Sequence, residues 1–331
     1  MRRDQLPPHK TATYVLPRWK VVYVSVPKAA CTSLKWLIAD LQDENPRRFY
    51  AALTREVGRA MTIHRRERWQ HTPMLHDLPD DELAAVSPER GWFVFAAIRQ
   101  PSARLWSGWQ SKFLLREPRW PELFGGEPWF PRVPRTTEDV VEDFQRFVLS
   151  IAENPEQPVM RDRHFQPQSR LITPERTPYT RIYHTREILE LLQDFATHLH
   201  GEGWEGSLEL LPSNETPLRP LASMFSPDVT AAIATVYGED FDRFGYENVL
   251  PDALEPADEY GEAALGEIGR LIERAERIGD LALRAQGLSR RTKKKQAEIK
   301  RLRHQVAELT PLKTRLVRGV RRRMARALNR A

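Results

Sequence analysis

The sequence is poor in cysteine and glycine, and it has no long apolar run. Cys31 is the one cysteine among 331 residues, which excludes an intramolecular disulfide framework and any zinc site built from several cysteines. The 16 glycines form no GxxxxGKS or GxxxxGKT sequence, so a Walker A loop is absent. No stretch approaches the roughly 18 apolar residues of a membrane span, and no apolar segment before Leu16 resembles a signal peptide. We therefore expect an unsecreted, cytoplasmic protein without a transmembrane anchor.

Positive charge is concentrated at one end of the chain. The net charge is +6, but residues 289–331 contain 16 Lys and Arg against 2 acids, which is a net +14. The preceding 288 residues therefore have a net charge of −8. The positive net charge of the whole chain is therefore no sign that residues 1–288 bind nucleic acid. No aromatic residues are interleaved with the basic residues of the tail, which disfavours nucleic acid as a partner there too.

Two apolar segments, 21–26 and 92–98, predict strands that are buried on both faces. A loop and then a helix follow each of them, with the helices expected at about 34–41 and 102–115. Three further helices are expected at 138–152, 186–199 and 226–237. A short strand is expected at 181–184, and a long loop at 116–134. Apolar residues make up 40% of the chain, enough for a core. This order of elements favours a layered α/β fold around a central parallel sheet.

Residues 258–331 predict a helical, coiled-coil-like extension. Small and apolar residues recur over 264–285 with the 4-3-4-3 spacing of a coiled-coil seam. Gly287 interrupts this spacing, which resumes at Ile299 and ends at Pro311. The last turns place apolar residues among arginines and predict a basic amphipathic helix. Four hypotheses stand for this tail: a solvated charge run, a coiled coil with a second copy or another chain, contact with an anionic membrane at its inner face, and, least favoured, nucleic acid.

The loop after the first strand has the features of a phosphate site. Residues 27–33 read Pro-Lys-Ala-Ala-Cys-Thr-Ser and lead from a strand into a helix. Such a loop directs successive backbone N–H groups toward one point, where the helix dipole also favours negative charge. Lys28 would add a full charge, and Thr32 and Ser33 would add hydroxyl donors. The same residues also suit an ordinary β–α turn in which Thr32 or Ser33 caps the helix.

A second anion-binding segment follows the second strand. Arg99 stands at the C-terminal end of that strand, where ligands gather in open α/β sheets. Ser107 lies about two turns into the next helix. An arginine fork and a hydroxyl together can hold a phosphate, although an arginine at a strand end is more often a surface charge.

Four segments, in order, resemble those of the PAPS-dependent sulfotransferases, in particular the Golgi carbohydrate sulfotransferase group (family 2) and its bacterial relatives. They are the 5′-phosphosulfate loop at 27–35 (PKAACTSLK), the 3′-phosphate segment at 99–107 (RQPSARLWS), and two downstream stretches at 162–168 (DRHFQPQ) and 237–246 (YGEDFDRFGY). The resemblance covers about 21–246. Gln100 departs from the pattern, because the family usually has an acid there.

The resemblance implies a P-loop NTPase-like three-layer sandwich over residues 21–250. Residues 1–20 are polar and punctuated by prolines, and we expect them to form an N-terminal arm. It implies in-line transfer of a sulfuryl group from PAPS (3′-phosphoadenosine 5′-phosphosulfate) to a hydroxyl of a carbohydrate or glycolipid, without a metal. Lys28 would be catalytic. The donor would be bound by Lys28, Ala29, Ala30, Cys31, Thr32, Ser33, Arg99 and Ser107. Cys31 fits as a small residue of the loop.

A general base should deprotonate the acceptor hydroxyl, and histidine is the usual type. His71 is the first candidate, because it lies between the two nucleotide-binding segments. His164 and His64 are rivals, and an Asp or Glu stays open. Two other functions are alternatives: a nucleotide-dependent phosphotransferase, which needs a Walker-type lysine and an acidic metal site, and a non-catalytic scaffold for the tail, whose nucleotide binding would be absent or idle.

Overall fold

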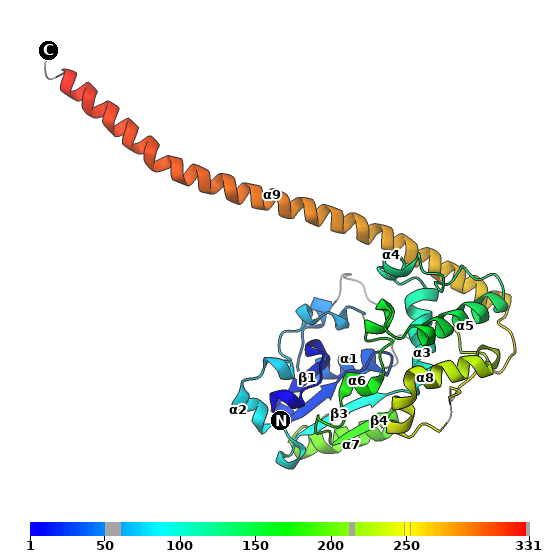
Figure 1. Cartoon of the computed structure of the whole chain (residues 1–331). Coiled ribbons are helices and arrows are strands. Elements are labelled where there is room, and N and C mark those ends of the chain that lie inside the picture. The colour runs from blue at the N-terminus through cyan, green and yellow to red at the C-terminus, as the bar shows by residue number, and fades with distance from the viewer. Residues whose placement is uncertain (50–60, 212–215, 248, 252, 329–331) are drawn as a thin grey trace. The chain divides into compact units, whose positions relative to one another are not determined.

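The computed structural model describes residues 1–49, 61–211, 216–247, 249–251 and 253–328 (Figure 1). The chain divides into two compact units, Met1–Ile272 and Glu273–Ala331. The first unit contains all of the strands that the described residues form. The last three residues of the predicted helical region, 329–331, lie outside the described residues.

The sheet of the first unit has four strands among the described residues. In order across the sheet they are β1 (Thr13–Leu16), β2 (Val21–Val24), β3 (Phe93–Ile98) and β4 (Arg181–His184). β2, β3 and β4 run parallel, whereas β1 is antiparallel to β2, so the sheet is mixed rather than wholly parallel as expected. Because three parallel strands end at one edge, the loops that follow them are neighbours.

Helices cover both faces of this sheet (Figure 1). Val22, Val24, Val94 and Ala96 share one apolar cluster with side chains of α3 (Pro101–Trp109), α5 (Thr137–Glu153) and α8 (Pro227–Phe244). Val21, Tyr23, Phe93 and Phe95 share the other with side chains of α1 (Cys31–Leu41) and α7 (Ile188–Gly201). Burial of both faces explains why β2 and β3 are almost continuously apolar in sequence. The shorter helices are α2 (Asp80–Ala85), α4 (Trp120–Phe124) and α6 (Gln168–Ile172).

Three expectations about local structure are corrected. Residues 1–20 are not an arm: β1 pairs along its length with β2, and the amino group of Met1 donates to the carbonyl of Val86 at 2.7 Å. The prolines around it hid this short strand. The predicted helix at 102–115 is α3 followed by a π-helical turn, Gln110–Leu114. The long loop at 116–134 contains α4.

The C-terminal region forms one helix, α9 (Glu262–Leu328), of 67 residues. Its first turns belong to the first unit, where Ile268 and Ile272 are buried in the core. α9 continues through Gly287 and Pro311, the positions at which the coiled-coil spacing of the sequence is interrupted and ends. A glycine costs a helix only about 1 kcal/mol, and strong helix formers on either side compensate. Among the helices that the structure describes, none combines the length and apolarity needed to cross a membrane.

Candidate active site

The loop between β2 and α1 has a constrained backbone. Lys28 and Ala30 both have positive φ angles, 68° and 53°, a region that non-glycine residues enter only where the surrounding structure holds them. Ala29 between them is fully buried. The first hydrogen bond of α1 runs from the N–H of Leu34 to the carbonyl of Ala30 at 3.0 Å. The N–H groups of residues 31–33 precede it, so they are donors that a phosphate could use.

Lys28 is a cation in a poorly solvated position. Its Nζ donates to the hydroxyl of Ser111 at 3.0 Å, and no carboxylate pairs with it among the residues described. Burial lowers its pKa to about 8, and the positive charges of Lys112 and Arg99 add to the effect. An anion placed here would relieve this unfavourable environment and restore the usual preference of a lysine for its charged form.

Lys112 belongs to the same group of charges, although sequence reasoning missed it. Its side chain lies in the π-helical turn, and its Nζ is 2.5 Å from a carboxylate oxygen of Glu117. It lowers the pKa values of both Lys28 and His164. The available signal was a lysine among apolar neighbours just beyond the second anion-binding segment. No motif marks it, because Lys28 and His164, the two groups whose pKa values it lowers, come from distant parts of the chain.

His164, one of the rival bases, is oriented by a carboxylate. Its Nδ1 lies 2.6 Å from Oδ1 of Asp162, and its backbone N–H donates to the same oxygen at 2.9 Å. A carboxylate only accepts, so Nδ1 is the protonated nitrogen and Nε2 is left with a free lone pair. Desolvation lowers the pKa of His164 to about 4, and Lys112 and Lys28 also act in this direction. The ring is therefore neutral at pH 7, with the lone pair that a base requires.

His64 is held in the opposite tautomer. Its Nδ1 is 3.0 Å from Nζ of Lys35, and its Nε2 is 3.0 Å from the hydroxyl of Thr32. An ammonium group only donates, so Nδ1 accepts and the Nε2 hydrogen goes to Thr32. The proton of the Thr32 hydroxyl is then free to reach a phosphate. Desolvation, followed by the charge of Lys35, lowers the pKa of His64 far below its usual value.

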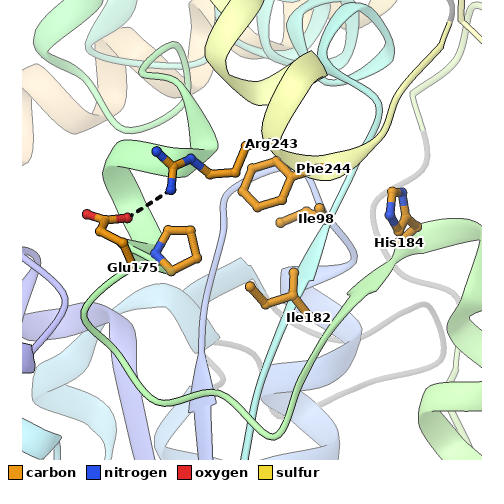
Figure 2. A pocket seen from close by; sticks show the side chains of 7 residues that line it. Ile98, Glu175, Ile182, His184, Arg243 and Phe244 are labelled. Carbon is orange, nitrogen blue, oxygen red and sulfur yellow. Dashed lines mark hydrogen bonds and ion pairs between the residues drawn. The ribbon is translucent and has the colours of Figure 1, made fainter.

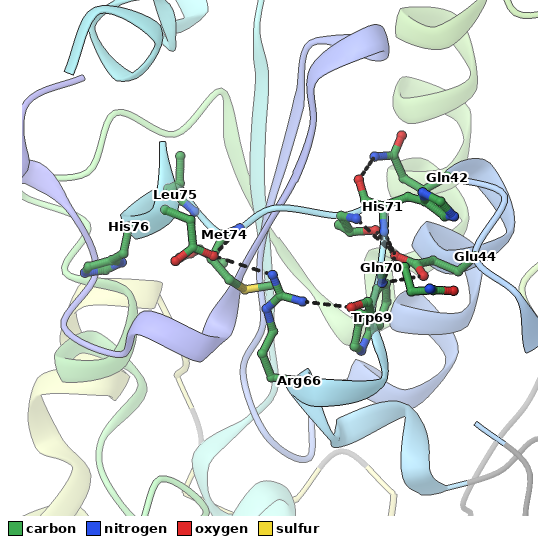
Figure 3. Close-up of polar contacts among 12 residues, drawn as sticks. Gln42, Glu44, Arg66, Trp69, Gln70, His71, Met74, Leu75 and His76 are labelled. Atoms are coloured by element: carbon green, nitrogen blue, oxygen red, sulfur yellow. Dashed lines mark hydrogen bonds and ion pairs between the residues drawn. The ribbon is translucent and has the colours of Figure 1, made fainter. Parts of the chain in front are cut away.

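His71, the first candidate, lies in a different polar network (Figure 3). Its backbone N–H donates to the buried carboxylate of Glu44 at 2.8 Å, and its carbonyl accepts from Gln42 at 3.3 Å. The residue is exposed, and no contact recorded among the described residues joins its ring to Lys28 or Arg99. The structure thus places His64 in hydrogen-bond contact with Thr32 of the phosphate loop, and it places His164 where the charges of Lys28 and Lys112 lower its pKa. Among the described residues, His71 has neither relation to these groups.

The second anion-binding segment is joined to the first. Nη1 of Arg99 lies 3.5 Å from the carbonyl oxygen of Lys28. The backbone of Arg99 is fixed on both sides by Gln168, whose Oε1 accepts from the N–H at 2.9 Å and whose Nε2 donates to the carbonyl at 2.7 Å. Ser107 lies in α3 and is 4% exposed. Both predicted 3′-phosphate residues are therefore carried by the β3–α3 unit.

The two downstream segments act as supports for these residues. The carboxylate of Asp240 is fully buried and accepts from the N–H groups of Gln168 at 2.7 Å and Ser169 at 2.8 Å. The hydroxyl of Tyr237 donates to the carbonyl of Phe165 at 2.7 Å. Asp240 thus orients Gln168, which in turn fixes the backbone of Arg99.

Arg104 joins three motif segments through one buried guanidinium. It donates to the carbonyls of Pro27 at 3.0 Å, Gln166 at 2.8 Å and Arg163 at 2.6 Å, and it is 1% exposed. These contacts hold the phosphate loop against the segment that carries His164. Arg104 is therefore a motif residue whose contacts are with other parts of the chain.

Gln100 explains the departure from the family pattern. Its Oε1 caps α3 by accepting from the N–H of Ala103 at 2.7 Å, while its Nε2 donates to the carbonyls of Val249 at 2.8 Å and Leu250 at 3.1 Å. An acid could provide the cap but not the two donations. The amide therefore suits the way in which residues 249–250 pack in this chain.

A cavity of about 380 Å³ lies beside the C-terminal ends of β3 and β4 (Figure 2). Its lining comes from the two strands, from the segment before β4 and from the end of α8: Ile98, Ile182, His184, Pro174, Glu175, Arg243 and Phe244. Arg243 and Glu175 form an ion pair at 3.2 Å on one side. Ile98 directly precedes Arg99, so the cavity adjoins the second anion-binding segment. Sequence reasoning did not predict it, because residues from four segments form it.

A family model described as the Sulfotransferase family matches residues 11–247. The chain belongs to the sulfotransferase family. This membership makes it a transferase of sulfuryl groups in general terms, and the matched range includes β1 and all four motif segments while it excludes α9. Searches of the curated proteins and of the solved structures found no match. Within the described part of the sulfotransferase, no cluster of three or more His, Cys, Asp or Glu is placed to hold a metal ion.

Proposed function

We propose that this sulfotransferase moves a sulfuryl group from PAPS to a hydroxyl of a carbohydrate or glycolipid acceptor. One observation carries the proposal: Lys28 and Lys112 act electrostatically on His164, which Asp162 orients, and Arg99 lies beside Lys28 at the same edge of the sheet. Cations suit a donor with two phosphate groups, and the neutral histidine suits an acceptor that must lose a proton.

The donor would lie along the edge at which β2, β3 and β4 end. The 5′-phosphosulfate would accept from the N–H groups of residues 31–33, the hydroxyls of Thr32 and Ser33, and the ammonium of Lys28. The 3′-phosphate would bind Arg99 and Ser107. The cavity at the end of β4 follows in the same direction and has room for the adenine base. In this arrangement, three neighbouring strand ends bind three neighbouring parts of one nucleotide.

The transfer needs little covalent chemistry from the protein. The acceptor oxygen forms a bond to sulfur while the bond from sulfur to the 5′-phosphate oxygen breaks, and Nε2 of His164 takes the hydroxyl proton. Lys28 stabilises the negative charge that grows on the leaving phosphate. We assign the base to His164 rather than to His71 or His64, because its Nε2 has the free lone pair and its surroundings include Lys28. His64 would position the Thr32 hydroxyl.

Thermal shift with adenosine 3′,5′-bisphosphate and with ATP tests the donor assignment. The bisphosphate has the 3′-phosphate that Arg99 would bind, whereas ATP lacks it. We expect selective stabilisation by the bisphosphate, and we expect Arg99→Ala to abolish that selectivity. Equal stabilisation by ATP would instead support a phosphotransferase, and no stabilisation by either nucleotide would support a non-catalytic scaffold.

A panel of acceptors tests the carbohydrate assignment, which depends on the family resemblance. Incubation with PAPS and neutral glycans, glycolipids, phenols or amines should give a sulfated product, detected by mass spectrometry, with the first two classes. Sulfation of phenols alone would contradict a carbohydrate acceptor, while sulfuryl transfer itself would stand.

A further inference from the structure

The second unit combines exposed apolar side chains with dense positive charge. Between residues 299 and 324 of α9, seven apolar residues are between 47% and 68% exposed: Ile299, Leu302, Val306, Leu316, Val317, Val320 and Met324. Residues 289–331 also contain 16 Lys and Arg against 2 acids. Nothing in the sulfotransfer chemistry uses this region, which lies beyond the residues that the family model matches. Adjacent exposed apolar side chains are typical of a contact surface.

The apolar residues lie on one side of the helix. At about 100° per residue, the seven positions fall within an arc of about 100°. Eight of the nine basic residues between 299 and 324 fall outside this arc: Lys300, Arg301, Arg303, Arg315, Arg318, Arg321, Arg322 and Arg323. The ninth, Lys313, falls inside it, and a long lysine side chain can bury its methylene groups there while its charge extends to water. This segregation is the pattern of a helix that lies at an interface between an apolar and a charged medium.

We propose that residues 299–324 of α9 bind the surface of a bilayer that contains anionic lipids. The apolar arc would enter the boundary between headgroups and acyl chains, while the long arginine side chains outside it would extend to the lipid phosphates. Charge complementarity favours an anionic bilayer, since each basic residue near such a surface strengthens the attraction. A soluble polyanion would satisfy the cations but would leave the apolar arc in water.

A second copy of the chain fits less well. A coiled-coil seam that begins at Ile299 and Leu302 continues with 3-4 spacing to Lys313 and Arg323, so charged residues would occupy its core. Two parallel copies would also bring two regions of net +14 together, and like charges across a coiled coil repel. Both effects favour the bilayer over self-association.

Co-sedimentation of the full chain with lipid vesicles tests this proposal. We expect binding to vesicles of phosphatidylcholine with about 30% phosphatidylglycerol and negligible binding to phosphatidylcholine alone. Replacing Arg318, Arg321 and Arg322 by Gln should weaken binding about 100-fold. The triple change Leu316→Gln, Val320→Gln and Met324→Gln keeps every charge and should still weaken binding at least about tenfold.

A matched control changes three exposed apolar residues of the same helix outside the basic region: Ile278→Gln, Leu281→Gln and Leu283→Gln. It should bind as the wild type does, and circular dichroism should show equal helicity in all variants. The proposal is overturned if anionic vesicles do not bind, or if single-stranded DNA or heparin binds as tightly and the Leu316/Val320/Met324 variant keeps that affinity. It is also overturned if light scattering shows a dimer that this variant abolishes and vesicles do not compete for.

Discussion

The two anion-binding segments reach the same edge of the sheet by different means. In the loop at 27–33, the donors that the proposed nucleotide would meet are backbone N–H groups, two hydroxyls and one lysine, and the backbone has positive φ at Lys28 and Ala30. In the segment at 99–107, Gln100, Ser102 and Arg104 donate to carbonyls elsewhere in the chain. Motif residues that look equivalent in sequence therefore divide into those that would bind the proposed nucleotide and those that hold the site together through contacts with other parts of the chain. Five predictions test this division.

Lys28→Ala should give the largest effect on activity. Removal of a charge aimed at the leaving group should lower kcat/KM by about 10³-fold, while the free energy of unfolding changes by less than about 1 kcal/mol. The measurement is release of adenosine 3′,5′-bisphosphate from PAPS with an active acceptor, alongside urea unfolding. Lys10→Ala, at an exposed lysine, is the control. A near-normal rate would remove Lys28 from the catalytic group.

His164→Ala should lower kcat by about 300-fold, within the range of general-base catalysis. Asp162→Asn should lower it by a smaller factor, because the amide can still orient the ring but does not favour the same tautomer. His64→Ala should raise the KM for PAPS more than it lowers kcat, and His71→Ala should be close to wild type. If His71→Ala lowered kcat as much as His164→Ala does, His71 would again be the better candidate for the general base.

Arg104→Met should lower the free energy of unfolding by about 2.5 kcal/mol, because three buried carbonyls lose their donor. Arg99→Met should change stability by less than about 1 kcal/mol and weaken bisphosphate binding instead. Urea unfolding and isothermal titration calorimetry on both variants measure the two quantities. If Arg99→Met lowered the stability and Arg104→Met weakened only bisphosphate binding, the assignment of Arg99 to the ligand and of Arg104 to structural support would be wrong.

Alkaline pH should weaken donor binding by about tenfold between pH 7 and pH 9. The pKa of Lys28 is lowered to about 8 in the folded protein, so the ammonium loses its proton as pH rises through that value, and the attraction for phosphate is lost with it. Lys28→Arg keeps its charge over this range and should bind the bisphosphate with a flat pH profile. A wild-type profile that is equally flat would contradict the lowered pKa.

Gln100→Glu should have the smallest effect, a loss of about 1 kcal/mol in the free energy of unfolding. It introduces the type of residue that the family usually has, yet it replaces two donations to carbonyls with a negative charge beside them. Thermal unfolding measures the loss. Gln100→Ala is the comparison, because it removes both the helix cap and the two donations, whereas Gln100→Glu removes only the donations. An increase in stability would show that residues 249–250 adapt to an acid.

Much of the fold follows from sequence periodicity, and much of the site does not. The strands β2, β3 and β4 and the main helices are confirmed near their predicted positions, because apolar runs and 3.6-residue periods reflect burial directly. β1 was missed because it has only four residues and is followed directly by a proline, so the sequence shows no apolar run long enough to predict a strand there. The role of Asp162 depends on which nitrogen of His164 it faces, and that of Arg104 on carbonyls up to 77 residues away. Neither is visible before the chain is folded.

The burial of the first turns of α9 has a practical consequence for anyone who expresses a shorter fragment. The similarity to the family ends at residue 247, whereas the packed unit ends at Ile272. A fragment cut at the first of these boundaries would lose the core side chains of Tyr260, Ile268 and Ile272 and expose the apolar surface beneath them. We expect such a fragment to aggregate, and one that retains the chain through the second boundary to purify as a folded enzyme.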